Sequence, residues 1–107
     1  MTELATVFRA LGDPVRLEMV KRLSAGESFT IAAVSQGFKI SRQGARKHLQ
    51  VLADADLVEL KPKGRDVLVE LQPAQIEQAK AFIGELEKLW DKRLEALKRF
   101  VESETPG

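Results

Sequence analysis

Residues 40–52, ISRQGARKHLQVL, contain four basic or potentially basic side chains and no Asp or Glu. On a helix, this segment presents a polar face opposite an apolar stripe. The side chains of the polar face are Arg42, Gln43, Arg46, Lys47 and Gln50. An Arg can donate two hydrogen bonds to the edge of a guanine, and a Gln can pair similarly with an adenine. The segment is therefore suited to reading bases in the major groove of DNA.

The helix that must hold these side chains has a start signal and a buried side. Ser41 is a good N-cap, and the N–H groups of such a helix start can donate to a phosphate. Ala45, Leu49 and Leu52 form the apolar stripe, so we expect a helix from Ser41 to about Ala55. An acid on the polar face would repel phosphates. A solvated helix that is basic by chance is the alternative for this segment taken alone.

Positive charge is concentrated in the middle of the chain. The whole sequence has 17 Lys and Arg against 16 Asp and Glu. Residues 39–65 contain seven of the basic residues and three of the acids, a net charge of +4, which leaves a net charge of −3 for the remainder. A nearly neutral chain with a basic middle is typical of a nucleic-acid binder, although a solvated charged surface could give the same count.

A second basic feature follows the helix. Residues 57–71, LVELKPKGRDVLVEL, alternate in polarity on either side of a Pro-Lys-Gly-Arg turn, which predicts a β-hairpin. The basic side chains around its tip are Lys61, Lys63 and Arg65. A hairpin after a recognition helix is a wing, and a basic wing tip is suited to the DNA backbone or minor groove. The two features together favour DNA binding over a solvated surface.

The elements on either side of these features are expected to be helical. Apolar spacing predicts a first helix that ends at residue 11 and a second from its cap, Asp13, to Gly26. A short third helix starts at its cap, Thr30, and a turn of about three residues leads to Ser41. Two short helices joined by a tight turn, the second of them basic, form a helix-turn-helix.

The last part of the chain, from Pro73, predicts one long helix. Apolar residues recur at three- and four-residue steps from Ile76 to Val101. About 30 residues at 1.5 Å each make a helix of roughly 45 Å, longer than the core of one small domain can cover. We expect the uncovered part of the stripe to be an interface.

Composition excludes several classes of function. The sequence has no Cys, which excludes disulfides, zinc–thiolate sites, haem attachment and thiol redox chemistry. His48 is the only His, and nothing near it supplies the other groups that catalysis needs, so we expect no enzyme activity and no cofactor. We expect His48 to bind a backbone group at the core edge or a DNA phosphate. No signal peptide or apolar run of ~20 residues occurs, so a cytoplasmic location with no membrane partner is expected.

Three segments resemble the ArsR/SmtB family of winged helix-turn-helix transcriptional repressors: FRALGDPVRLEMVKRL at 8–23, ISRQGARKHLQVLADADLV at 40–58 and KGRDVLVEL at 63–71. The resemblance covers residues 7 to about 75. It implies a single domain over residues 1–107, mainly α-helical, with four helices, a β-hairpin and a last helix. It also implies a homodimeric repressor that binds a palindromic operator through the fourth helix and the wing.

The dimerisation helices implied by the resemblance are residues 1–11 and 74–103. The interface residues expected on them are Leu4, Val7, Phe8, Ile83, Leu86, Trp90, Leu94 and Leu97. An alternative is a winged-helix module that no longer reads DNA and binds other proteins. The absence of acids between residues 39 and 51 favours DNA binding, because a protein-binding module has no reason to exclude them.

The sequence departs from the family pattern at several positions. Asp56 stands where the family usually has Gly, and we expect the turn to survive because Asp tolerates left-handed backbone better than most residues. Arg46 stands where many members have Ser, which implies an altered operator. Metal-sensing members have Cys on the third helix or Asp and His on the last one, and both sets are missing here. The acids Glu87, Asp91 and Glu95 are offset by neighbouring Lys and Arg, so we expect no metal site.

Overall fold

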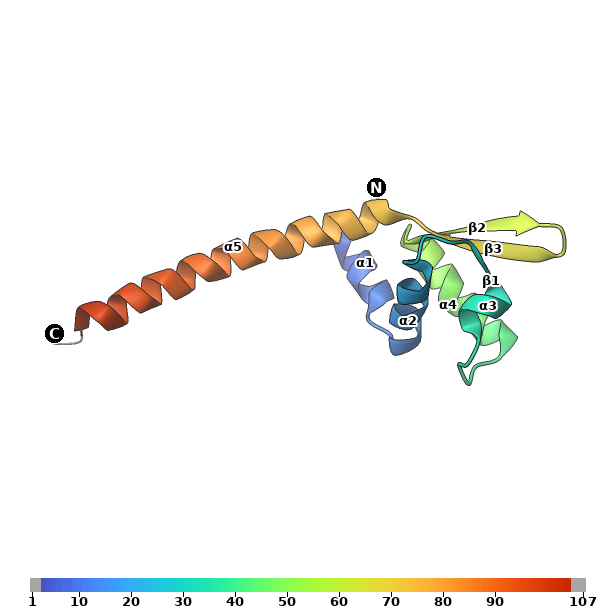
Figure 1. Cartoon of the computed structure of the whole chain (residues 1–107), viewed down its shortest axis with the longest axis horizontal. Coiled ribbons are helices and arrows are strands. Elements are labelled where there is room, and N and C mark those ends of the chain that lie inside the picture. Colours follow the sequence, from blue (N-terminus) through green and yellow to red (C-terminus); the bar gives the residue numbers. More distant parts are fainter. Residues whose placement is uncertain (1–2, 105–107) are drawn as a thin grey trace.

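The computed structural model describes residues 3–104, so residues 1–2 of the expected first segment lie outside the described residues. The helices and strands in chain order are α1 (Leu4–Leu11), α2 (Pro14–Leu23), β1 (Phe29–Thr30), α3 (Ile31–Ser35), α4 (Arg42–Asp54), β2 (Val58–Lys63), β3 (Asp66–Leu71) and α5 (Pro73–Glu104). α1 to α4 gather beside the sheet, and α5 runs away from them (Figure 1). The predicted winged helix-turn-helix is confirmed, with one additional strand.

The three N-caps predicted from the sequence are confirmed. Asp13 Oδ2 accepts hydrogen bonds from the backbone N–H groups of Val15 and Arg16, at 2.9 and 3.1 Å. Thr30 Oγ1 accepts from the N–H of the third residue after it at 3.1 Å. Ser41 Oγ accepts from the N–H of Gly44 at 2.9 Å. Each cap satisfies an N–H that has no partner within its helix, which fixes where α2, α3 and α4 begin.

The turn of the helix-turn-helix is longer than expected. α3 ends at Ser35 and the cap of α4 is Ser41, so five residues lie between them instead of about three. Gly37 lies in this turn with φ +88°. α3 ends at Ser35 because the next residue, Gln36, is already extended, with ψ 132°. Gly37 then completes a tight turn in which the N–H of Phe38 donates to the carbonyl oxygen of Ser35, and Gly adopts the left-handed backbone of this turn without steric cost.

The hairpin belongs to a three-stranded antiparallel sheet with the order β1-β3-β2. Lys63 pairs with Asp66 across a two-residue loop whose first residue, Gly64, has φ +60°. β1, which the sequence did not predict, pairs Phe29 with Val69 and Thr30 with Leu68. Thr30 thus ends β1 and caps α3, so the wing strand β3 is joined directly to the start of the helix-turn-helix.

One buried cluster lies beneath α1 to α4 and the sheet, and α5 reaches it only with its first turns. The fully buried side chains of this cluster include Val7, Met19, Leu23, Val34, Leu49, Leu52, Leu57 and Val69. From α5, Ala79 is buried and Ile76 packs against the cluster. The Phe82 ring lies 5.9 Å from the Phe8 ring of α1. The large apolar side chains of α5 after Phe82 are 45–60% exposed. The far end of α5 extends away from the other elements, and the molecule measures 73 × 30 × 22 Å (Figure 1). No helix within residues 3–104 is long and apolar enough to span a membrane.

The turn between α4 and β2 contains the one left-handed non-glycine residue among the described residues, Asp56, with φ +58°. This confirms that Asp replaces Gly here without loss of the turn. We expect Asp56→Ala to be less stable than Asp56→Gly by about 1 kcal/mol, because a Cβ strains this conformation. Denaturant unfolding of the two variants measures the difference. Both variants remove the Asp side chain, so its interactions cancel in the comparison, and equal stability would contradict the prediction.

Candidate nucleic-acid interface

The buried side of α4 determines which of its side chains face outward. Leu49 and Leu52 are fully buried and Ala45 is nearly so, in the cluster formed with α1, α2 and β2. The exposed residues at the helix start and on the opposite side are Ser41, Arg42, Gln43, Arg46, Lys47 and Gln50. The predicted base-reading residues therefore lie together on one accessible surface, which we call the α4 face.

An acidic residue, Asp54, lies at the C-terminal end of the α4 face. Gln50 Nε2 donates a hydrogen bond to Asp54 Oδ1 at 2.8 Å. Asp54 would repel a nearby phosphate, whereas the first three turns of α4 contain no acid. Base recognition by this helix is therefore favoured near its N-terminal half, where Arg42, Gln43 and Arg46 are exposed.

The three basic residues of the wing are all exposed but differ in their partners. Lys61 Nζ lies 3.0 Å from Glu70 Oε2, and Ser28 Oγ donates to Glu70 Oε1 at 2.7 Å. The hydrogen bond with Glu70 raises the pKa of Lys61, and those from Ser28 and Lys61 lower the pKa of Glu70. Lys63 and Arg65 have no acidic partner within residues 3–104. The free positive charge of the wing is therefore at its tip.

A groove brings the wing and the α4 face together. Arg42 and Arg46 of α4 and Arg65 of the wing all line it, and its volume is about 280 Å³. The three guanidinium groups belong to segments about 20 residues apart in the sequence. The groove, which Asp66 also lines, therefore brings basic side chains of the recognition helix and of the wing to one surface.

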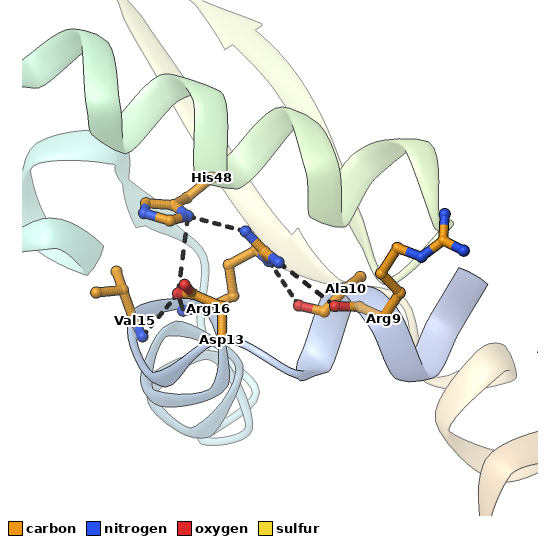
Figure 2. Close-up of polar contacts among 6 residues, drawn as sticks. All are labelled: Arg9, Ala10, Asp13, Val15, Arg16 and His48. Carbon is orange, nitrogen blue, oxygen red and sulfur yellow. Dashed lines mark hydrogen bonds and ion pairs between the residues drawn. The ribbon is translucent and has the colours of Figure 1, made fainter. Parts of the chain in front are cut away.

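His48 faces the other helices rather than the α4 face. Its Nδ1 lies 3.2 Å from Arg16 Nη1 and 3.8 Å from Asp13 Oδ2, and its side chain is 24% exposed (Figure 2). The expected contact with a backbone group was wrong, since these partners are side chains of the α1–α2 turn and α2. The hydrogen bond from the backbone N–H of Arg16 lowers the pKa of Asp13 despite some desolvation.

Comparisons with known proteins agree with this geometry. Residues 11–61 match a family model described as a helix-turn-helix domain. The uncharacterized HTH-type transcriptional regulator YuzN of Bacillus subtilis is 37% identical over 65 residues, which cover 55% of this chain and 71% of that protein. The structure of an ArsR-like transcriptional regulator from Rhodococcus sp. RHA1 is 30% identical, with a TM-score of 0.74 over 91% of each chain. This chain belongs to the ArsR family. It is a DNA-binding transcriptional regulator.

The name of a further relative of this ArsR-family regulator refers to arsenical resistance. The arsenical resistance operon repressor of Staphylococcus xylosus is 32% identical over 69 residues, which cover 64% of this chain and 65% of that protein. In this chain α3 has the sequence IAAVS, and Glu87, Asp91 and Glu95 are exposed on α5. Within residues 3–104, no three His, Asp or Glu side chains are grouped closely enough to hold a metal ion.

The residues expected at a dimer interface divide into two groups in this ArsR-family member. On α5, Ile83, Leu86, Trp90, Leu94 and Leu97 are 45–60% exposed, and Phe8 of α1 is 36% exposed. Leu4 is half-buried. Val7 was wrongly expected there, because it is fully buried in the core of its own protomer. A second exposed apolar row on α5, which was not predicted from the sequence, consists of Phe82, Leu89 and Phe100.

Arg22, which was not predicted from the sequence to have a role, contacts the turn of the helix-turn-helix. Its Nη1 donates hydrogen bonds to the carbonyl oxygens of Val34 and Gln36, at 3.0 and 2.7 Å. Its guanidinium lies over the Phe38 ring, 4.4 Å from the ring centre. Arg22 thus binds carbonyls that the early end of α3 leaves without helical partners. In the sequence, Arg22 is only a basic residue in the last turn of a helix, and no spacing indicates that it binds carbonyls of the next turn.

Proposed function

We propose that this ArsR-family regulator is a homodimeric repressor that binds a palindromic operator. In this proposal, α4 enters the major groove and the wing contacts the DNA backbone. The observation that carries the proposal is the α4 face: exposed Arg and Gln side chains, free of acids over three turns, on a helix whose buried side is fixed by Leu49 and Leu52. Such a helix has the donors that distinguish guanine and adenine edges.

The homodimer is supported by the uncovered apolar surface of α5. From Ile83 to Glu104, 22 residues extend roughly 33 Å at ~1.5 Å per residue beyond the contacts with α1. Their large apolar side chains are about half exposed, which a lone soluble protomer would not favour. A second copy offers the same surface, and two-fold symmetry would place two α4 helices on successive major grooves of an inverted repeat.

Selection of bound duplexes from a random pool tests this function. We expect an enriched inverted repeat whose half-site centres are about 34–36 Å apart, one turn of DNA. Expression of a reporter behind the selected sequence should fall when the protein is present. Enrichment of no sequence would contradict operator recognition, and a single enriched half-site would contradict the dimeric mode of binding.

The wing is expected to contribute affinity without sequence preference. Lys63→Ala and Arg65→Ala should each weaken operator and scrambled duplex equally, and should lower the slope of log affinity against log salt by about two per dimer, one phosphate in each half-site. Lys61→Ala is the matched control, because the Lys61 charge is already paired with Glu70. Titrations at several salt concentrations measure the slopes. An equal loss of slope for Lys61→Ala would contradict this assignment.

A further inference from the structure

Arg16 connects the end of α1 to the middle of α4. Its Nε donates a hydrogen bond to the carbonyl oxygen of Ala10 at 2.6 Å, and its Nη2 donates to that of Arg9 at 3.4 Å. On another side of the same guanidinium, Arg16 Nη1 lies 3.2 Å from His48 Nδ1 (Figure 2). One planar group therefore touches two helices that are separated by more than 30 residues in the sequence.

The chemistry of these contacts requires an Arg. The last carbonyls of α1 have no partners within the helix and carry its negative dipole end, so they attract a cation that donates hydrogen bonds. A guanidinium is a rigid fork of N–H donors, whereas a Lys ammonium is a point charge on a flexible stem. A guanidinium can only donate hydrogen bonds, so His48 Nδ1 is the acceptor in its hydrogen bond with Arg16.

The contact with His48 constrains α4 in a way that its apolar contacts do not. Leu49 and Leu52 bury α4 by packing, which is not directional and tolerates small rotations or shifts. A hydrogen bond to His48 loses strength steeply with misalignment. Arg46 lies two residues before His48, so a rotation of α4 about its axis would turn Arg46 away from the DNA base that it is proposed to read.

We propose that Arg16 is a positioning residue for DNA reading: it fixes the rotation of α4 relative to α1 through the hydrogen bond with His48. Because α1 packs against α5 through Phe8 and Phe82, this contact also relates the recognition helix to the surface proposed for dimerisation. The inference rests on the proposed operator recognition by α4. It adds two residues, Arg16 and His48, that act through α4 without touching DNA.

The test compares operator and scrambled duplex binding for Arg16→Lys, His48→Leu and the double variant. We expect each single variant to lose about tenfold in the ratio of operator to scrambled affinity, and the double variant to lose no more than the worse single one, since both break one contact. Scrambled-duplex affinity should stay near that of the wild type. His48→Gln, which retains an acceptor oxygen, should recover most of the ratio.

The matched control is Arg9→Gln against Arg16→Gln. Both remove one positive charge, but the Arg9 side chain points away from the cluster and only its carbonyl takes part (Figure 2). Equal losses for the two variants, additive losses in the double variant, or no recovery by His48→Gln would overturn the positioning role. If the wild type itself prefers no sequence, the proposed function fails and the inference fails with it. A wild type that prefers its operator, with Arg16 variants that keep this preference, overturns the inference alone.

Discussion

The variant with both Leu86→Glu and Trp90→Glu is expected to be a monomer that binds the operator on the order of a thousandfold more weakly than the wild type, close to nonspecific affinity. Leu86 is 48% exposed and Trp90 is 60% exposed on α5. Two carboxylates there would have to be desolvated to form the proposed interface, which is costly without partners. Sedimentation measures the mass, and titration with operator duplex measures the affinity.

A control variant separates this effect from a change of net charge. Lys88→Gln with Arg99→Gln also lowers the net charge by two, but helical spacing places these positions on the opposite side of α5 from Leu86 and Trp90. We expect this variant to remain dimeric and to bind the operator with a modest loss that added salt removes. A wild-type protein that sediments as a folded monomer at micromolar concentration would contradict the proposed interface.

Arg46→Ala is expected to cost about 1–3 kcal/mol in each half-site, or about 2–6 kcal/mol for the dimer, on the selected operator. The physical reason is the loss of a side chain that can donate two hydrogen bonds to one base. Discrimination at a single base pair per half-site should relax, while the other positions keep their preference. Titration against operators changed one base pair at a time measures both effects.

Arg42→Ala should behave in the same way at a different base pair, because Arg42 lies one turn earlier on the same helix. Lys47→Ala is the comparison, since Lys47 is an exposed point charge on the same helix. This variant should bind DNA more weakly without a change in its discrimination between base pairs. If the Arg42 and Arg46 variants weaken operator and scrambled duplexes equally, α4 is an electrostatic anchor and sequence is read elsewhere.

The elements that carry strong local signals could be predicted from the sequence. The caps at Asp13, Thr30 and Ser41 are local, because each hydrogen bond joins residues two or three positions apart. The hairpin follows from alternation on both sides of one turn. The buried stripe of α4 follows from periodicity, and it in turn determines which basic residues are exposed.

Features that depend on distant residues could not be predicted in this way. β1 is two residues long, too short for alternation, and exists because β3 has an edge for it to pair with. The partner of His48 is Arg16, 32 residues away, and no sequence spacing links the two. Helical spacing alone does not distinguish a core residue of α1 from an interface residue. Only the packing of α1 on the core shows that Val7 is buried.

Whether the exposed half of α5, beyond Phe82, stays helical depends on what packs against it. An amphipathic helix in water owes most of its stability to packing of its apolar face, and its backbone hydrogen bonds alone are marginal. In this half, a second copy provides that packing in our proposal, so the helix–coil equilibrium and the association of two chains are coupled. Dilution that separates the protomers therefore also favours coil beyond Phe82. The amount of protein present sets how much of each chain is ordered as well as how many dimers form.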